Sequence, residues 1–106
     1  MANRNLAEEK AWADASRIFP DCVVAREYRF MKERRFRLDI AIMEKKIGIE
    51  VEGGLFVGGR HSRGAGIETD MLKYNYLSLL GWRLLRFTPR QIEADHHIEF
   101  LEQMKD

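Results

Sequence analysis

Three carboxylates at strand spacing are the residues in this sequence whose types favour chemistry. Glu50 and Glu52 lie two residues apart in the segment IGIEVEGG. A strand would place both side chains on one face, about 6.6 Å apart along the chain. Asp39 lies in the preceding segment RLDIAI, and a turn near Lys45 would bring it beside Glu50 or Glu52. We therefore expect three acids to converge on one patch of sheet.

Unpaired carboxylates raise each other's pKa, because like charges repel at short range. A hard divalent cation removes that cost, and oxygen ligands with open coordination positions suit Mg²⁺ or Mn²⁺. Such an ion activates water and stabilises charge on a phosphate. The alternative is a polar sheet face exposed to solvent. The apolar residues around the acids favour a covered sheet, and Gly53 and Gly54 would let backbone or ligand come close.

The elements that must position these acids read as an antiparallel meander of three strands, at residues 23–31, 35–43 and 47–52. In the second strand, strict alternation divides the residues between two faces. The apolar face would hold Phe36, Leu38, Ile40 and Ile42, and the other face would hold Arg35, Arg37, Asp39 and Ala41.

Helical periodicity frames the meander. We expect a first helix at residues 6–19, a second at 67–80 ending at Gly81, a fourth strand at 82–87 and a last helix opening at Pro89. The apolar stripe of the first helix would be Trp12, Ala15 and Phe19, and that of the last helix Ile92, His96, Phe100 and Met104. The order α-β-β-β-α-β-α predicts an α/β fold with a mixed four-stranded sheet flanked by helices.

Composition sets the limits of these interpretations. The 106 residues suit a single domain, and 45% hydrophobic with 33% charged residues is globular rather than disordered. No apolar run approaches the roughly 20 residues of a membrane span, and the single Cys22 cannot form an internal disulfide, so we expect a cytosolic location and no membrane partner. The net charge of +1 neither demands nor excludes nucleic acid, whereas basic residues cluster near residues 32–37 and at Arg60 and Arg63.

Three stretches together resemble the PD-(D/E)XK nuclease superfamily, and in particular the small very-short-patch-repair-like endonucleases and related uncharacterised bacterial and phage nucleases. They are RFRLDIAIMEKKIGIEVEGG, GGRHSRG and ETDMLKYNYLSLLGWRLLRFTP, which span about half the chain. The chained pattern is D, E-x-E-G, H, D-x-x-K and G-W-x-x-x-R-F. The resemblance implies a restriction-endonuclease-like core and hydrolysis of DNA phosphodiester bonds with Mg²⁺ or Mn²⁺.

Carried over by position, the resemblance implies that Asp39 and Glu50 bind the metal. Glu52 stands where many members carry the motif lysine, so it is either a third ligand or only a neighbour. Lys73 is the candidate for a lysine moved to the following helix, with the alternative that it pairs with Asp70 at i, i+3.

Other candidate site residues lie outside the strands. His61 matches a functional histidine of the very-short-patch-repair-like enzymes and would act as a general base or hold a phosphate. The resemblance also implies a further metal-binding acid on the first helix, which would be Glu8 or its neighbour Glu9; the alternative is an ordinary glutamate favoured by the helix dipole. Phosphate-binding arginines would be Arg35, Arg60 and Arg63. We interpret His96 and His97 as structural or surface residues.

The leading hypothesis is a metal-dependent endodeoxyribonuclease in a single domain of residues 1–106, acting in a bacterial or phage-infected host cytoplasm during DNA repair or recombination. One small domain has little surface for reading a long sequence, so branched, nicked or mismatched DNA is expected. The preference for DNA comes from the resemblance alone. A homodimer would let two centres cut paired strands. The alternatives are a non-catalytic nucleic-acid-binding or assembly module on a nuclease scaffold, and a structural subunit with a satisfied polar sheet face.

Overall fold

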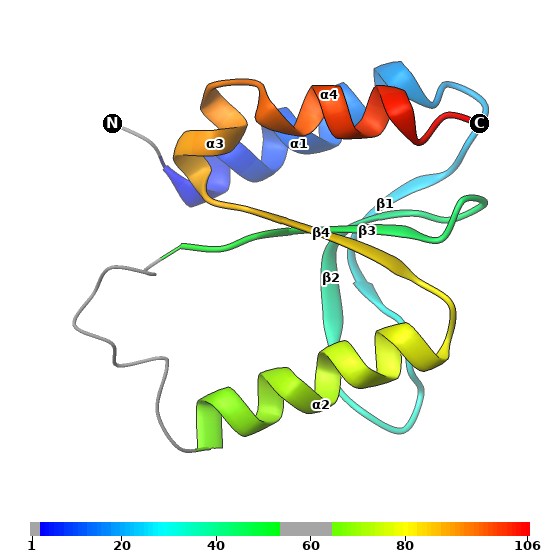
Figure 1. The fold of residues 1–106 in the computed structure, drawn as a ribbon, viewed down its shortest axis with the longest axis vertical. Helices are drawn as coiled ribbons and strands as arrows, with labels where there is room; N and C mark the ends of the chain where they lie inside the picture. The colour runs from blue at the N-terminus through cyan, green and yellow to red at the C-terminus, as the bar shows by residue number, and fades with distance from the viewer. Residues whose placement is uncertain (1–2, 54–64) are drawn as a thin grey trace.

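The computed structural model describes residues 3–53 and 65–106, and it contains one four-stranded sheet between two layers of helices (Figure 1). In chain order the elements are α1 (Arg4–Ile18), β1 (Val24–Arg29), β2 (Arg37–Ile42), β3 (Ile47–Val51), α2 (Ala65–Leu79), β4 (Arg83–Phe87), α3 (Pro89–Glu93) and α4 (His96–Gln103). The expected α/β class, mixed sheet and element order are confirmed, with the last helical segment divided into two short helices. Among the described residues, no helix is long and apolar enough to cross a membrane.

The sheet order is β1-β2-β3-β4, and the first three strands form the expected antiparallel meander. Strand β4 pairs with β3 in parallel, which α2 makes possible as a crossover connection. Helices α1, α3 and α4 cover one face of the sheet, and α2 covers the other (Figure 1). The sheet therefore has both faces covered around its central strands.

Local signals explain where helices begin and end. The Asn3 side chain accepts the N–H of Leu6 and caps α1. Thr88 and Gln91 form a capping box at the start of α3, directly before Pro89. After α2, Gly81 adopts a φ of 86°, a left-handed conformation that glycine reaches without a side-chain clash.

The hydrophobic core is divided by the sheet. The larger cluster lies under α1, α3 and α4 and includes Ala11, Ala15, Ile18, Ile40, Ile42, Ile49 and Leu101. The smaller cluster lies under α2 and consists of Leu38, Ala41 and Leu77, packed by Tyr28 and Trp82. Trp12 departs from the expected stripe, because it is 38% exposed and its indole N–H donates to the carbonyl of Val24.

The expected alternation along β2 is wrong at one point. Ile40 and Ile42 face the α1 side, whereas Leu38 packs with Ala41 on the α2 side. The facing of the side chains therefore reverses at Asp39. Across the strand pair from Asp39, Glu27 has a φ of 50°, a conformation that breaks the regular pleat of β1 at the same level.

The expected apolar face of the last helix is also wrong. Asp95 adopts a φ of 65° and separates α3 from α4, which changes the helical phase after Ile92. As a result His97 and Leu101 are buried, while His96 and Phe100 are exposed.

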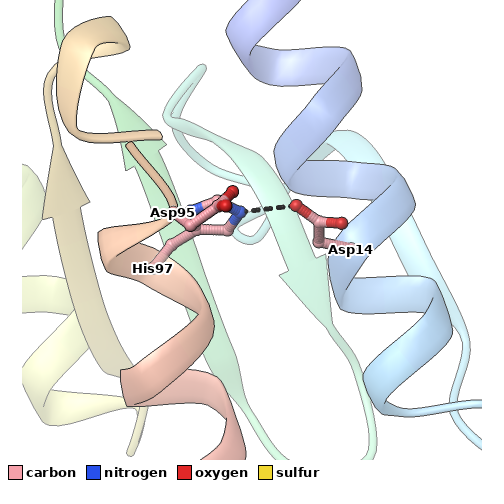
Figure 2. Close-up of side chains that lie close together, drawn as sticks. All are labelled: Asp14, Asp95 and His97. Atoms are coloured by element: carbon pink, nitrogen blue, oxygen red, sulfur yellow. Dashed lines mark hydrogen bonds and ion pairs between the residues drawn. The ribbon is translucent and has the colours of Figure 1, made fainter. Parts of the chain in front are cut away.

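The buried His97 links the last helix to the first. Its Nε2 lies 2.8 Å from Asp14 Oδ2, and the two side chains point toward one another from α4 and α1 (Figure 2). The Lys10 ammonium lies 3.1 Å from Asp14 and 2.7 Å from Asp95, so one cation neutralises both acids. This group holds the helical layer together, in agreement with the structural role expected for His97.

Candidate active site

Asp39 and Glu50 lie where the β2–β3 ladder ends. The ladder pairs Ile40 with Ile49, and beyond that pair the carboxylates take over the hydrogen bonding. The N–H of Asp39 donates to Glu50 Oε2 at 3.0 Å, and the N–H of Val51 donates to Asp39 Oδ2 at 2.8 Å. Both acids are only 8% exposed. The backbone of the opposite strand therefore fixes each carboxylate in place.

Lys73 joins this acid pair from α2. Its Nζ lies 2.6 Å from Glu50 Oε1, and its side chain is 15% exposed. Lys73 is thus bound to Glu50 across the fold rather than only facing Asp70 along its own helix. Burial raises the pKa of Glu50, the Lys73 ammonium lowers it and the Asp39 charge raises it, with a net increase.

Glu8 approaches the same site from α1, as its position in the first helix suggested. Arg4 stands between the acids: one guanidinium nitrogen lies 3.0 Å from Glu8 Oε2, and another lies 3.2 Å from Asp39 Oδ1. The pKa of Glu8 is raised to about 7, mainly by burial and then by the Asp39 charge, while the Arg4 charge opposes the increase. Arg4 therefore supplies the positive charge that this acid group needs. Its signal in the sequence was the i, i+4 spacing to Glu8.

Glu27 is a further acid that sequence reasoning missed. Glu8, Glu27 and Asp39 each place a carboxylate oxygen within 4.8 Å of the other two. Burial raises the pKa of Asp39, the Val51 N–H and Arg4 lower it, and Glu27 raises it, with a net increase. Glu27 lies between Arg26 and Tyr28, which pair with Ile40 and Leu38, so the register of β1 on β2 sets it opposite Asp39.

Glu52 is held in a separate group on the α2 side of the sheet. The Arg86 guanidinium binds both of its carboxylate oxygens, the second at 3.1 Å, and the Tyr74 hydroxyl lies 3.4 Å away. Glu50 and Glu52 both meet residues of α2, as expected from their two-residue spacing. Burial raises the pKa of Tyr74, so its hydroxyl remains a donor. In this structure the carboxylate of Glu52 is therefore bound by Arg86 and Tyr74.

The chemistry of the donor set around Asp39 fits a hard divalent cation. Glu8, Glu27 and Asp39 present carboxylate oxygens within 4.8 Å of one another, and Glu50 lies beside Asp39 through its bond to the Asp39 N–H. An oxygen that accepts one hydrogen bond keeps further lone pairs. A set built from carboxylates favours Mg²⁺ or Mn²⁺ over softer metals. The pKa values of Glu8, Asp39 and Glu50 are raised mainly because burial disfavours the charged form, and the charges of neighbouring acids add to the increase.

Arg60, His61 and Arg63 lie outside the described residues. Arg35 is exposed in the loop between β1 and β2, four residues before Asp39. Comparison with family models, curated proteins and solved structures finds no match to this chain. The function is therefore argued from the site itself.

Proposed function

We propose that this protein is a Mg²⁺- or Mn²⁺-dependent endodeoxyribonuclease that hydrolyses phosphodiester bonds. The observation that carries the proposal is the buried acid pair Asp39–Glu50 with the Lys73 ammonium 2.6 Å from Glu50. Two acids from neighbouring strands and a lysine from the crossover helix combine metal-binding oxygens with a proton donor. The preference for DNA comes from the resemblance to PD-(D/E)XK nucleases.

Each residue has a distinct role in this proposal. Asp39, Glu50 and Glu8 would hold the metal, which when bound lowers the pKa of water and neutralises charge on the phosphate. Lys73 donates a hydrogen bond to Glu50 and has further N–H groups for a phosphate oxygen or the attacking water. Arg4 contacts Glu8 and Asp39 in this structure, and a cation bound by these acids would free its guanidinium to contact a phosphate oxygen.

Structure-selective cleavage of branched, nicked or mismatched DNA is part of the proposal. One domain of 106 residues offers little surface for reading a long base sequence. A phosphate-directed site needs only an accessible backbone, which distorted DNA provides at defined places.

A panel of labelled linear, nicked, mismatched and four-way DNAs with Mg²⁺ or Mn²⁺ tests the proposal. We expect Asp39→Asn and Glu50→Gln to lower cleavage by about 100-fold or more, and Lys73→Met by about 100-fold. Glu52→Gln is the matched control, because Glu52 directly follows β3 but is bound by Arg86. If Asp39→Asn and Glu50→Gln cut like wild type, the proposed centre is wrong.

The Arg4 contacts favour a second candidate, a non-catalytic nucleic-acid-binding module on the same scaffold. In the structure Arg4 already neutralises Glu8 and Asp39, as a resident cation would in a protein that needs no metal. Calorimetry with Mn²⁺ separates the two candidates. Millimolar Mn²⁺ should bind wild type and bind the Asp39→Asn variant much more weakly; no heat of binding with wild type favours the second candidate.

A further inference from the structure

The hairpin formed by β1, β2 and their loop concentrates positive charge. Residues 26–37 contain six basic and two acidic residues, a net charge of +4, whereas the whole chain has a net charge of +1. All six basic residues are exposed: Arg26, Arg29, Lys32, Arg34, Arg35 and Arg37. Within residues 3–53 and 65–106, the ion pair found for this segment is Arg37 with Glu27, at 3.9 Å. Such a surface favours a polyanionic partner.

The loop at the end of this hairpin is held by its own hydrogen bonds. The Arg29 guanidinium donates to the carbonyl of Arg34 at 2.9 Å and to the carbonyl of Lys32 at 3.0 Å. One arginine thus fixes the backbone that carries the other cations at two points. An ordered loop loses less conformational entropy when a ligand binds.

Aromatic packing attaches the loop to α2. The ring of Phe36 stacks on Phe30 and packs against Tyr76 of α2, each at 6.2 Å between centroids. The Arg34 guanidinium lies over both Phe36, at 5.6 Å, and Tyr76, at 5.3 Å. Figure 1 shows the β1–β2 loop on the α2 side of the sheet. The loop therefore has a fixed position relative to the helix that carries Lys73.

Strand β2 connects this loop directly to the acid pair. Arg35 is four positions before Asp39, so their Cα atoms lie at most about 14 Å apart. The loop cations and the acid pair are thus near enough to contact one stretch of DNA backbone.

We propose that the loop cations Lys32, Arg34 and Arg35 bind the phosphate backbone of DNA on one side of the Asp39–Glu50 centre. This inference rests on the proposed function, which places a phosphodiester at the acid pair. The contacts are to phosphates, so they position the duplex without reading its bases. Because the loop cations lie apart from the acid pair, the loop would bind DNA while the acid pair cleaves it.

Salt-dependent binding of a fluorescent duplex, measured with EDTA in an Asp39→Asn background, tests this inference without cleavage. The test variant is Lys32→Ala with Arg35→Ala, which spares Arg34 and its aromatic contacts. The matched control is Arg17→Ala with Lys105→Ala, which removes the same charge from exposed ion pairs on the helical layer. We expect the slope of log K against log salt to fall by about 1.8 for the test variant. The control should keep the parent slope.

Charge-preserving exchange gives a second check. Lys32→Arg with Arg35→Lys should retain the slope, because phosphate contacts depend on charge more than on side-chain shape. If the alanine pair behaves like the control, the inference is overturned, while cleavage by wild type still supports the proposed nuclease. If wild type binds no duplex at low salt, or if polyglutamate of equal charge displaces DNA equally well, the inference is also overturned. If loop-dependent binding occurs without cleavage of any DNA, the nuclease proposal fails and the binding surface stands.

Discussion

Glu50 Oε2 accepts the backbone N–H of Asp39 at 3.0 Å, so the side chain of one acid satisfies the main chain of the other. In turn, the backbone N–H of Val51 donates a hydrogen bond to Asp39 Oδ2. These two hydrogen bonds replace the backbone pairing of β2 with β3, which ends at Ile40 and Ile49. The acids are therefore part of the sheet as well as of the proposed metal site.

Glu50→Ala and Glu50→Gln should differ in stability but should both lack cleavage activity. Glu50→Ala leaves the buried N–H of Asp39 without an acceptor, which costs about 1–3 kcal/mol in the free energy of unfolding. Glu50→Gln retains an amide oxygen for that bond and should cost less. Both variants should lose cleavage, because neither presents a carboxylate. Urea unfolding beside the cleavage assay checks the split; equal stabilities of the two variants would contradict the structural role.

Glu8 should make stability depend on pH. Its folded-state pKa is about 7, against an ordinary value of 4.5 for a glutamate side chain, mainly because it is buried. Between those values the folded state binds more protons than the unfolded state, so stability falls as pH rises from about 4.5 to about 7 and stays lower above that. Glu8→Gln is neutral throughout and removes this dependence. The difference in Tm, variant minus wild type, should therefore increase by several degrees from pH 5 to pH 8.

Added Mn²⁺ distinguishes burial from metal binding at Glu8. A cation that binds the folded state raises Tm by mass action, and a carboxylate ligand contributes to that affinity. At pH 8, Mn²⁺ should stabilise wild type more than Glu8→Gln. The same Tm difference at pH 5 and pH 8, with no response to Mn²⁺, contradicts both expectations.

The sequence predicts the parts of the site that depend on regular spacing. The meander, the closeness of Asp39 to Glu50 and the shared face of Glu50 and Glu52 follow from a period of two and one short turn. These features are local, so periodicity alone is sufficient to place them. Glu8 differs, because it was expected from the resemblance and is linked to Asp39 through Arg4, across the packing of α1 on the sheet.

The missed features depend on departures from regular geometry. The left-handed φ of Glu27 and the reversal at Asp39 move Leu38 to the α2 side, which strict alternation does not predict. The left-handed Asp95 likewise changes the phase of the last helix, so His97 rather than His96 is buried. Such positions are set by the tertiary environment, because none of these residues is a glycine.

Asp14 should matter for the fold and not for the proposed chemistry. Burial opposes ionisation of Asp14, but the bonds from His97 and Lys10 prevail and lower its pKa. A lowered folded-state pKa stabilises the protein above the unfolded value of 3.8, and this stabilisation is lost as pH falls through the folded-state value. Asp14→Ala should cost about 2–3 kcal/mol at pH 7, since it leaves the fully buried His97 without its partner. The cost, measured by urea unfolding, should shrink below pH 4, while cleavage per folded molecule stays unchanged.

Gly48 should be intolerant of a side chain because Leu38 crosses to the α2 side. A Cβ at Gly48 would lie 2.8 Å and 2.9 Å from the two Cδ atoms of Leu38, and Leu38 is fully buried with Leu77. Overpacking of this kind costs about 1–3 kcal/mol, so Gly48→Ala should destabilise the protein by that amount. Because Leu38 precedes Asp39, its displacement should also lower cleavage. A double-mutant cycle with Leu38→Val checks the cause: the shorter side chain should recover part of the loss in Gly48→Ala, whereas strictly additive effects would show that this contact is not responsible.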